Sequence, residues 1–315
     1  MKKVVFIGNC GHAGQAFETL NNRTDVSICG FAVGSEHEDA KSFGFSDVPC
    51  FDSYIEMLDT VKPDLAVISP VFGLTGSVIL ECTKRGIDVF SEKPVAASLE
   101  ELETVKQAVL SSGIRFGAMH YLRVSPAFWL GARLVKEGKI GEVRMLTAQK
   151  SYRYGTRPAW YSDRDLFTGI IPWIGIHAID WIYAFSGKRF LSVDAECFGT
   201  PERAAFCRFS MENDVMAAIN LDYYRPALAP THDDDRIRVA GTEGVLEVRE
   251  GKVFLMNGEG CVTLTPEEAP ELLDSFLDGW EIVPAEDVFY LTRVALCARL
   301  AADRGERVEI EVKNG

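Results

Sequence analysis

The first 120 residues alternate short apolar, β-branched runs with helical segments, and this alternation limits the possible folds more than any other feature. Amphipathic segments such as 53–61 and 98–110 separate the runs, and Ser98 with Glu101 forms a capping box for the second of these helices. The expected strands are VVFIG (4–8), VSICGFA (26–32), DLAVIS (64–69), DVFSE (88–92) and IRFGAM (114–119). Such repeats predict a parallel sheet with crossover helices. Residues 1–122 are therefore predicted to form a doubly wound, Rossmann-type α/β domain with its ligands beyond the carboxyl ends of the strands.

After Pro126 the pattern changes to strands in close succession. A helix (126–137) and a strand (142–150) lead into an aromatic and basic loop (151–168). The later elements are expected at 191–198, 203–211, 214–223, 236–240, 244–249 and 252–256 (strands), about 286–303 (a helix) and 307–312 (a short strand, RVEIEV). Short turns between neighbouring strands favour antiparallel pairing. Residues 123–315 are therefore predicted to form an α+β domain with a mostly antiparallel sheet.

Composition and charge argue against several classes of function. The 46 acidic residues against 33 basic ones leave a net charge of −13, which repels a phosphate backbone, so no nucleic-acid partner is expected. The apolar segments look too short for a membrane span of about 18 residues, and the N-terminal run is too short for a signal peptide. We therefore expect a cytoplasmic protein with no membrane partner. Eight cysteines without a CxxC pair indicate neither a zinc site nor a disulfide framework.

The first expected strand runs into the turn GNCGHAG, in which Gly8, Gly11 and Gly14 recur every three residues. A dinucleotide fold needs glycine in this turn so that the backbone can approach the pyrophosphate, which then lies at the amino end of the next helix. The spacing is one residue longer than the usual GxGxxG. With a strand before it and a helix after it, the turn predicts a cofactor site that includes His12 and Ala13.

The sequence leaves the choice between NAD and NADP open. An NAD-preferring site usually has an acid about twenty residues after the turn, to accept hydrogen bonds from the adenosine ribose. Here that position reads Ala32-Val33-Gly34-Ser35. Ser35 can donate to a 2′-phosphate, although no arginine follows nearby, and Glu36 is an alternative ribose acceptor. We assign Gly34, Ser35 and Pro70, which follow the second and third strands, to the cofactor site.

The fourth expected strand ends in SEKPV (91–95), at the sheet edge where ligands are expected. Pro94 holds the preceding Lys93 in an extended conformation, and a pocket lysine with a lowered pKa can act as an acid or a hydrogen-bond donor. The alternative is an exposed ion pair between Glu92 and Lys93.

The glycine turn, EKP at 92–94 and GIHAID at 175–180 together resemble the glucose-fructose oxidoreductase/inositol dehydrogenase/rhizopine catabolism (Gfo/Idh/MocA) family. RVSPAF (123–128) and DDRIRVAGTEGVLEV (234–248) extend the resemblance over essentially the whole chain. It implies an NAD(P)-dependent oxidoreductase of sugars, sugar acids or cyclitols that forms a homodimer or homotetramer through its second domain. It also implies that Glu92 and Lys93 lie at the cofactor, that Lys93 lies by the nicotinamide and substrate, and that Pro94 follows a cis peptide.

Two positions depart from the family pattern. Many members have Asp-x-Gly-x-His and form a Lys-Asp-His triad, whereas this chain has Trp173 in place of the aspartate, four residues before His177. Members also often have a histidine in the loop after the third strand, and PVFGLTG (70–76) has none.

His177 and Asp180 are the remaining catalytic candidates. Removal of hydride from an alcohol carbon leaves a proton on the oxygen, and histidine is the natural acceptor near neutral pH. The resemblance gives this role to His177, with Lys93 bonded to the same oxygen. Asp180 either orients the imidazole in place of the absent triad acid, caps backbone, or meets an arginine from the other domain. No metal is expected, because His-x-x-Asp supplies only two ligands.

Five residues are candidates for the substrate pocket, three of them in or beside the aromatic and basic loop. They are Tyr152, Arg157, Trp160, Trp173 and His232. Such side chains bind hydroxyls, acid groups or the apolar face of a sugar ring, although an oligomer interface or a core uses the same residue types. The three aspartates at 233–235 are interpreted as a solvated turn.

The leading hypothesis is a dehydrogenase that interconverts a secondary alcohol and a ketone on a small polyol. Two alternatives remain: transient use of the same cofactor for elimination or epimerisation, and a non-catalytic protein that senses dinucleotides. The missing acids at 173 and at the ribose position motivate the last of these.

Overall fold

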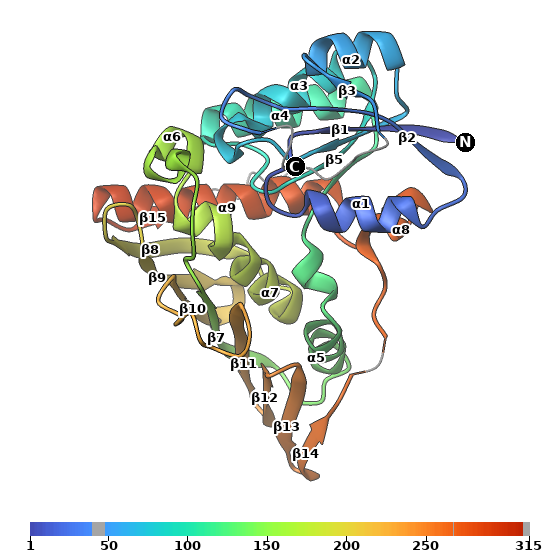
Figure 1. Cartoon of the computed structure of the whole chain (residues 1–315). Helices are drawn as coiled ribbons and strands as arrows, with labels where there is room; N and C mark the ends of the chain where they lie inside the picture. Colours follow the sequence, from blue (N-terminus) through green and yellow to red (C-terminus); the bar gives the residue numbers. More distant parts are fainter. Residues whose placement is uncertain (40–47, 267, 311–315) are drawn as a thin grey trace. The chain divides into compact units, whose positions relative to one another are not determined.

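The computed structural model describes residues 1–39, 48–266 and 268–310, which form two compact units (Figure 1). The first unit comprises Met1–Met119, Asp163–Thr168 and Glu271–Thr292, and the second His120–Ser162, Gly169–Pro270 and Arg293–Gly315. Two later segments thus group with the first unit. The sequence analysis placed one boundary after residue 122, and that boundary stays a prediction.

The first unit is built on a six-stranded parallel sheet in the order β3-β2-β1-β4-β5-β6. Its strands are β1 (Lys2–Ile7), β2 (Val26–Ala32), β3 (Cys50–Phe51), β4 (Leu65–Ile68), β5 (Asp88–Ser91) and β6 (Phe116–Ala118). Its helices are α1 (Ala13–Asn21), α2 (Tyr54–Val61), η2 (Phe72–Leu74), α3 (Thr75–Thr83), α4 (Leu99–Ser112), α6 (Arg164–Phe167) and α8 (Leu272–Leu277), with the first part of α9 (Ala285–Arg304). The sheet reverses its direction of growth at β1, which confirms the predicted doubly wound fold.

Apolar burial and helix caps explain why these segments form this sheet. All four residues of β4 are buried, as expected for a central parallel strand covered on both faces. The predicted capping box of α4 forms in part. The Glu101 amide donates to the Ser98 hydroxyl at 3.1 Å, while the Glu101 carboxylate accepts from the amide of Ala97 instead of that of Ser98.

The second unit is built on a nine-stranded sheet in the order β14-β13-β12-β11-β7-β10-β9-β8-β15. Its strands are β7 (Val143–Tyr152), β8 (Phe190–Phe198), β9 (Ala204–Met211), β10 (Met216–Asp222), β11 (Asp233–Gly241), β12 (Gly244–Arg249), β13 (Lys252–Asn257), β14 (Gly260–Leu264) and β15 (Val308–Glu309). Its helical segments are η3 (Tyr121–Val124), α5 (Pro126–Lys136), η4 (Ala159–Ser162), the π-helical η5 (Ile171–Gly175), α7 (Ile176–Ser186), η6 (Glu212–Asp214) and the rest of α9. Among the described strands of this sheet, only β7 and β10 pair in parallel, which confirms the mostly antiparallel sheet.

Helix α7 packs on the central strands of this sheet and on α5 (Figure 1). Trp181 stacks on Phe128 with ring centroids 4.0 Å apart and donates its indole N–H to the carbonyl of Leu122 at 3.1 Å. The helical run Arg164–Ser186 has the length and apolarity of a membrane span, contrary to the expectation that no segment does, but 83% of its apolar window is buried. A helix that is apolar all round is typical of a protein core.

The sequence missed several short elements. It did not anticipate β3, β14 or α8, and the expected loop 151–168 contains η4 and α6. Elements of two to six residues carry too little periodicity to be recognised without their partners. The predicted strand at 307–312 is represented by β15, and its last two residues lie outside the described part of the chain.

Candidate active site

The turn between β1 and α1 needs glycine because its backbone runs close to the end of β4. Gly8 (φ 82°) and Gly11 (φ 61°) have left-handed backbone angles, which glycine adopts without strain. A Cβ atom on Gly8 would lie 2.4 Å from the carbonyl oxygen of Ser69. Cys10 N donates to the same carbonyl at 2.8 Å and holds the turn in place. The amino end of α1 thus lies at the carboxyl edge of the sheet, where a dinucleotide phosphate binds.

The first turn of α1 leaves room for a ligand. A Cβ atom added to Gly14 meets no protein atom within 4 Å, so internal packing does not require glycine there. The side chain of Ala13 is buried and has only its backbone to offer a cofactor. Together with the Gly8 and Gly11 turn, this arrangement fits a nicotinamide dinucleotide.

His12, in the same turn, is bound to Glu92 after β5. The backbone amide of His12 donates to Glu92 Oε2 at 2.6 Å, and its ring Nδ1 lies 2.9 Å from the same oxygen. Glu92 is fully buried. Burial by itself raises the pKa of this carboxyl, but the charges of His12 and Lys93 and the hydrogen bonds from His12 outweigh it and lower the pKa to about 2. The carboxylate therefore stays charged and joins the turn to the end of β5.

Lys93 is 1% exposed, and its Nζ lies 3.7 Å from Glu92 Oε1. The alternative of an exposed ion pair is wrong, because both side chains are buried. The Lys93–Pro94 peptide is cis, as the resemblance implies. Its role in catalysis stays a prediction, but the structure brings three predicted residues together: the buried Glu92 and Lys93 and the partly exposed His12.

The predicted ribose region contains an acid that the sequence analysis missed. Gly34 lies against Pro70, since an added Cβ would meet the Pro70 Cβ at 2.5 Å. The Ser35 hydroxyl donates to Glu38 Oε1 at 3.2 Å. Glu36, the alternative ribose acceptor, is exposed. Glu38 lies six residues beyond the end of β2, outside the spacing at which an acid is usually sought.

In the second unit, Asp180 of α7 is a fully buried carboxylate with two partners. Arg123 Nε donates to Asp180 Oδ1 at 2.9 Å, and His120 Nδ1 lies 3.6 Å from Oδ2. Burial raises the pKa of Asp180, but the charges of Arg123 and His120 prevail and lower it to about 2. Asp180 therefore meets an arginine, as one alternative proposed, but Arg123 belongs to the same unit and not to the other domain. That Asp180 orients His177 stays a prediction.

His177 lies one turn before Asp180 on α7 and is 2% exposed. Its ring is edge-on to that of His120, with centroids 6.4 Å apart. The imidazole of His120 is therefore a neighbour of both the Asp180 carboxylate and the His177 ring. The sequence analysis gave no role to His120 or to Arg123, although His120 comes two residues after β6, the last strand of the parallel sheet, where ligand-contacting residues are expected. No group of three His, Cys, Asp or Glu side chains among the described residues is placed to hold a metal ion.

Trp173 lies in the π-helical turn η5 that leads into α7, and it is 8% exposed. Single π-helical turns often occur at functional sites. The chain thus carries a large apolar side chain four residues before His177, at the position where the family pattern has an acid.

The other pocket candidates form one aromatic and basic cluster in the second unit. The rings of Tyr152 and His232 lie 5.1 Å apart. The Arg157 guanidinium lies 5.1 Å from the ring centroid of Tyr161, which in turn packs against Trp160 at 4.4 Å. Burial, followed by the charge of Arg157, lowers the pKa of His232. The cluster offers a cation, a phenol and an imidazole to a polar ligand.

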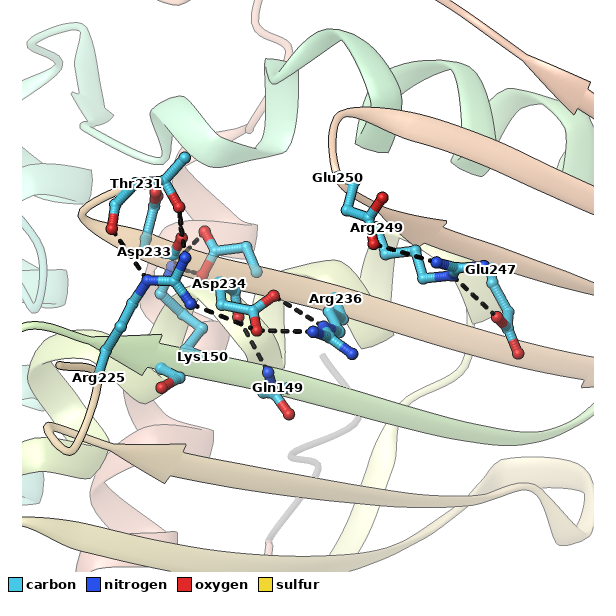
Figure 2. Close-up of polar contacts among 12 residues, drawn as sticks. Gln149, Lys150, Arg225, Thr231, Asp233, Asp234, Arg236, Glu247, Arg249 and Glu250 are labelled. Atoms are coloured by element: carbon cyan, nitrogen blue, oxygen red, sulfur yellow. Dashed lines mark hydrogen bonds and ion pairs between the residues drawn. The ribbon is translucent and has the colours of Figure 1, made fainter. Parts of the chain in front are cut away.

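Beneath this cluster, β7 carries a fully buried lysine that the sequence analysis missed. Lys150 Nζ lies 2.7 Å from Asp235 Oδ2 and 4.7 Å from the ring centroid of Tyr152. Burial lowers the pKa of Lys150 and raises that of Asp235, while the charge of each partner opposes both shifts. Figure 2 labels Lys150 and Gln149 of β7 together with Asp233 and Asp234 of β11.

The three aspartates at 233–235 are thus not a solvated turn. They begin strand β11, whose register places Asp235 opposite Lys150 of β7. Asp234 instead binds Arg236 at 2.7 Å (Figure 2). Alternation along the strand sends neighbouring carboxylates to opposite faces.

Comparison with known proteins gives two family matches. Residues 2–120 match the oxidoreductase family with an NAD-binding Rossmann fold, and residues 131–247 match the GFO/IDH/MocA C-terminal domain. A solved Thermotoga maritima protein described as an oxidoreductase is 39% identical, with a TM-score of 0.94 over 98% of this chain and 100% of that one.

Two further relatives carry substrate names. The 1,5-anhydro-D-fructose reductase of Ensifer adhaerens is 26% identical over 81% of this chain and 82% of its own length. The scyllo-inositol 2-dehydrogenase (NADP(+)) of Bacillus subtilis (strain 168) is 26% identical over 43% of this chain and 38% of its own length.

Proposed function

The chain belongs to the Gfo/Idh/MocA family of oxidoreductases, and from this premise we propose that it interconverts a secondary alcohol and a ketone on a sugar, sugar acid or cyclitol. The observation that carries the proposal is the buried Lys93 ammonium, joined through Glu92 and His12 to the glycine turn. The substrate class is supported by the two relatives that act on an anhydro sugar and an inositol.

In the first unit the residues hold the cofactor and a proton donor. When bound, the nicotinamide takes up or returns the hydride of the substrate carbon. Lys93 donates a hydrogen bond to the substrate oxygen and stabilises the charge that develops there. Glu92 keeps the ammonium in place, because a buried charge needs a partner.

In the second unit His177 takes the proton of the substrate hydroxyl. The usual triad aspartate is replaced by Trp173, so His177 relies on a different neighbour. We place His120 in that position, with Asp180 and Arg123 behind it as positioning residues, supported by the 3.6 Å and 2.9 Å contacts of Asp180. Arg157, Tyr152 and His232 bind the remaining hydroxyl or acid groups of the substrate.

Coenzyme binding followed by turnover tests the proposal. NADH and NADPH are titrated against the protein by nucleotide fluorescence, and polyols, sugar acids and cyclitols are then screened for reduction of the coenzyme. Lys93→Met and His177→Asn should each lower kcat about 10²- to 10⁴-fold, the usual contribution of a positioned proton-transfer group. Lys252→Met, on an exposed strand position, is the matched control and should leave kcat unchanged.

Two outcomes would count against the dehydrogenase. If neither coenzyme binds at micromolar concentrations, the protein is not a dinucleotide enzyme. Substrate conversion without net reduction of the coenzyme would instead identify internal redox chemistry, as in elimination or epimerisation.

A further inference from the structure

The connection after β2 carries one mostly buried acid, Glu38, at the carboxyl edge of the parallel sheet. Its Oε2 accepts from the amide of Gly34 at 3.3 Å, and its Oε1 accepts from the amide of Val71 at 3.1 Å and from the Ser35 hydroxyl at 3.2 Å. Gly34 follows β2 and Val71 follows β4. Because β1 lies between these two strands, the carboxylate spans the end of β1, where the glycine turn begins.

A second observation also places Glu38 at the glycine turn. Burial raises the pKa of the Cys10 thiol, and the charge of Glu38 is the next cause of that shift. The backbone of Asn9 is one of the groups that donate a hydrogen bond to the Glu38 carboxyl. These hydrogen bonds lower the pKa of Glu38, but burial has the larger effect and raises it. The carboxylate therefore faces the same turn whose glycines fit a dinucleotide.

The donors around Glu38 leave it able to accept another ligand. Backbone amides fix the carboxylate, whereas the Ser35 hydroxyl is a rotatable donor that a ligand hydroxyl can replace. No Lys, Arg or His from the described part of the chain forms an ion pair with Glu38. A ribose offers two neighbouring hydroxyls, which are the donors that a carboxylate at this edge binds.

We infer that Glu38 is the ribose acceptor missing from the end of β2, and that it makes the enzyme select NAD(H) over NADP(H). The inference rests on the proposed function. In NADP(H) the 2′-hydroxyl is replaced by a phosphate, whose negative charge meets the Glu38 carboxylate in a partly buried site. Ser35, which the sequence left as a donor to such a phosphate, is instead bonded to the acid. Family membership leaves the choice open, since the Bacillus subtilis relative is named for NADP(+).

The test measures coenzyme binding and needs no substrate. NADH and NADPH are titrated by fluorescence against the full chain, and ADP-ribose and its 2′-phosphate are used as competitors that lack the nicotinamide. We expect the unmodified protein to bind NADH at least about tenfold tighter than NADPH. In Glu38→Gln this preference should fall by about tenfold or more, with weaker NADH and tighter NADPH binding.

Two further variants make the result specific. Glu36→Gln removes the neighbouring exposed acid and should leave the preference unchanged. Glu38→Asp keeps the charge on a shorter side chain, so it should weaken NADH binding while still excluding NADPH. Circular dichroism and thermal melting of each variant show whether it remains folded.

The outcomes separate this inference from the proposed function. Equal or tighter binding of NADPH by the unmodified protein overturns the role of Glu38, as does an unchanged preference in folded Glu38→Gln. If the unmodified protein binds neither coenzyme nor ADP-ribose, the dinucleotide function fails and the inference fails with it.

Discussion

Each unit has one fully buried carboxylate beside a candidate catalytic residue, and the two carboxylates differ in their partners. Glu92 in the first unit precedes Lys93 and is bound by His12. Asp180 in the second unit lies one turn after His177 and is bound by Arg123 and His120. The pKa of each is lowered to about 2. The partners of Glu92 lie in motifs that the sequence displays, whereas those of Asp180 are brought to it by folding.

The strongest test of this comparison removes the guanidinium from Asp180. We expect Arg123→Met to lower the free energy of unfolding by about 3–5 kcal/mol, because it leaves a buried carboxylate without its main cation. Urea denaturation measures the change. Arg144→Met, which breaks the exposed pair with Glu142, is the matched control and should cost at most about 1 kcal/mol. Equal losses in the two variants would show that Asp180 is not held by its charge partner.

At low pH, protonation of Glu92 and Asp180 should lower the stability of the folded protein. The pKa of Glu92 falls from 4.5 and that of Asp180 from 3.8, each to about 2. As the pH falls the unfolded chain binds these protons first, so stability is full above about pH 4.5 and is lost toward pH 2. Each group contributes on the order of 2–4 kcal/mol.

Urea denaturation of the unmodified protein, Glu92→Gln and Asp180→Asn between about pH 7 and pH 3 measures that dependence. In each variant, the free energy of unfolding should fall less between about pH 7 and pH 3 than it does in the unmodified protein. An acid response that is the same in all three proteins would mean that other carboxylates dominate.

The smallest expected effects are on NADH binding and on kcat, and they should distinguish the role of His12 from that of His120. His12→Gln changes the glycine turn, so we expect weaker NADH binding with little change in kcat. His120→Gln removes the imidazole that neighbours both Asp180 and His177, so we expect kcat to fall roughly tenfold with unchanged NADH binding, in line with the cost of a displaced catalytic group. The pH profile of kcat should also shift in His120→Gln and not in His12→Gln. If both variants affect binding alone, His120 does not position His177.

Much of the fold was predictable because it depends on local pattern. The alternation of strands and helices up to residue 120 predicted the parallel sheet, and the glycine spacing predicted a turn whose backbone angles the structure confirms. The EKP and GIHAID segments predicted family membership. Their catalytic assignments to Lys93, His177 and Asp180 stay predictions, as does the substrate pocket.

The missed residues share a physical cause. Glu38, His120 and Arg123 act on partners in other elements, and Lys150 meets Asp235 only through the register between β7 and β11. A single sequence shows that Asp233, Asp234 and Asp235 are adjacent, but it does not show which of them faces the core. A shift of one residue in that register would have buried a different aspartate.

By itself the sequence determined the order of elements, the glycine turn and the chemical types available at the sheet edge, because periodicity and backbone preference act over a few neighbouring residues. Only the tertiary structure decided which charges are buried and with whom they pair. Burial makes an unpaired charge costly, so the pairings of Glu92, Asp180 and Lys150 depend on residues that the chain brings together from as far as 85 positions away.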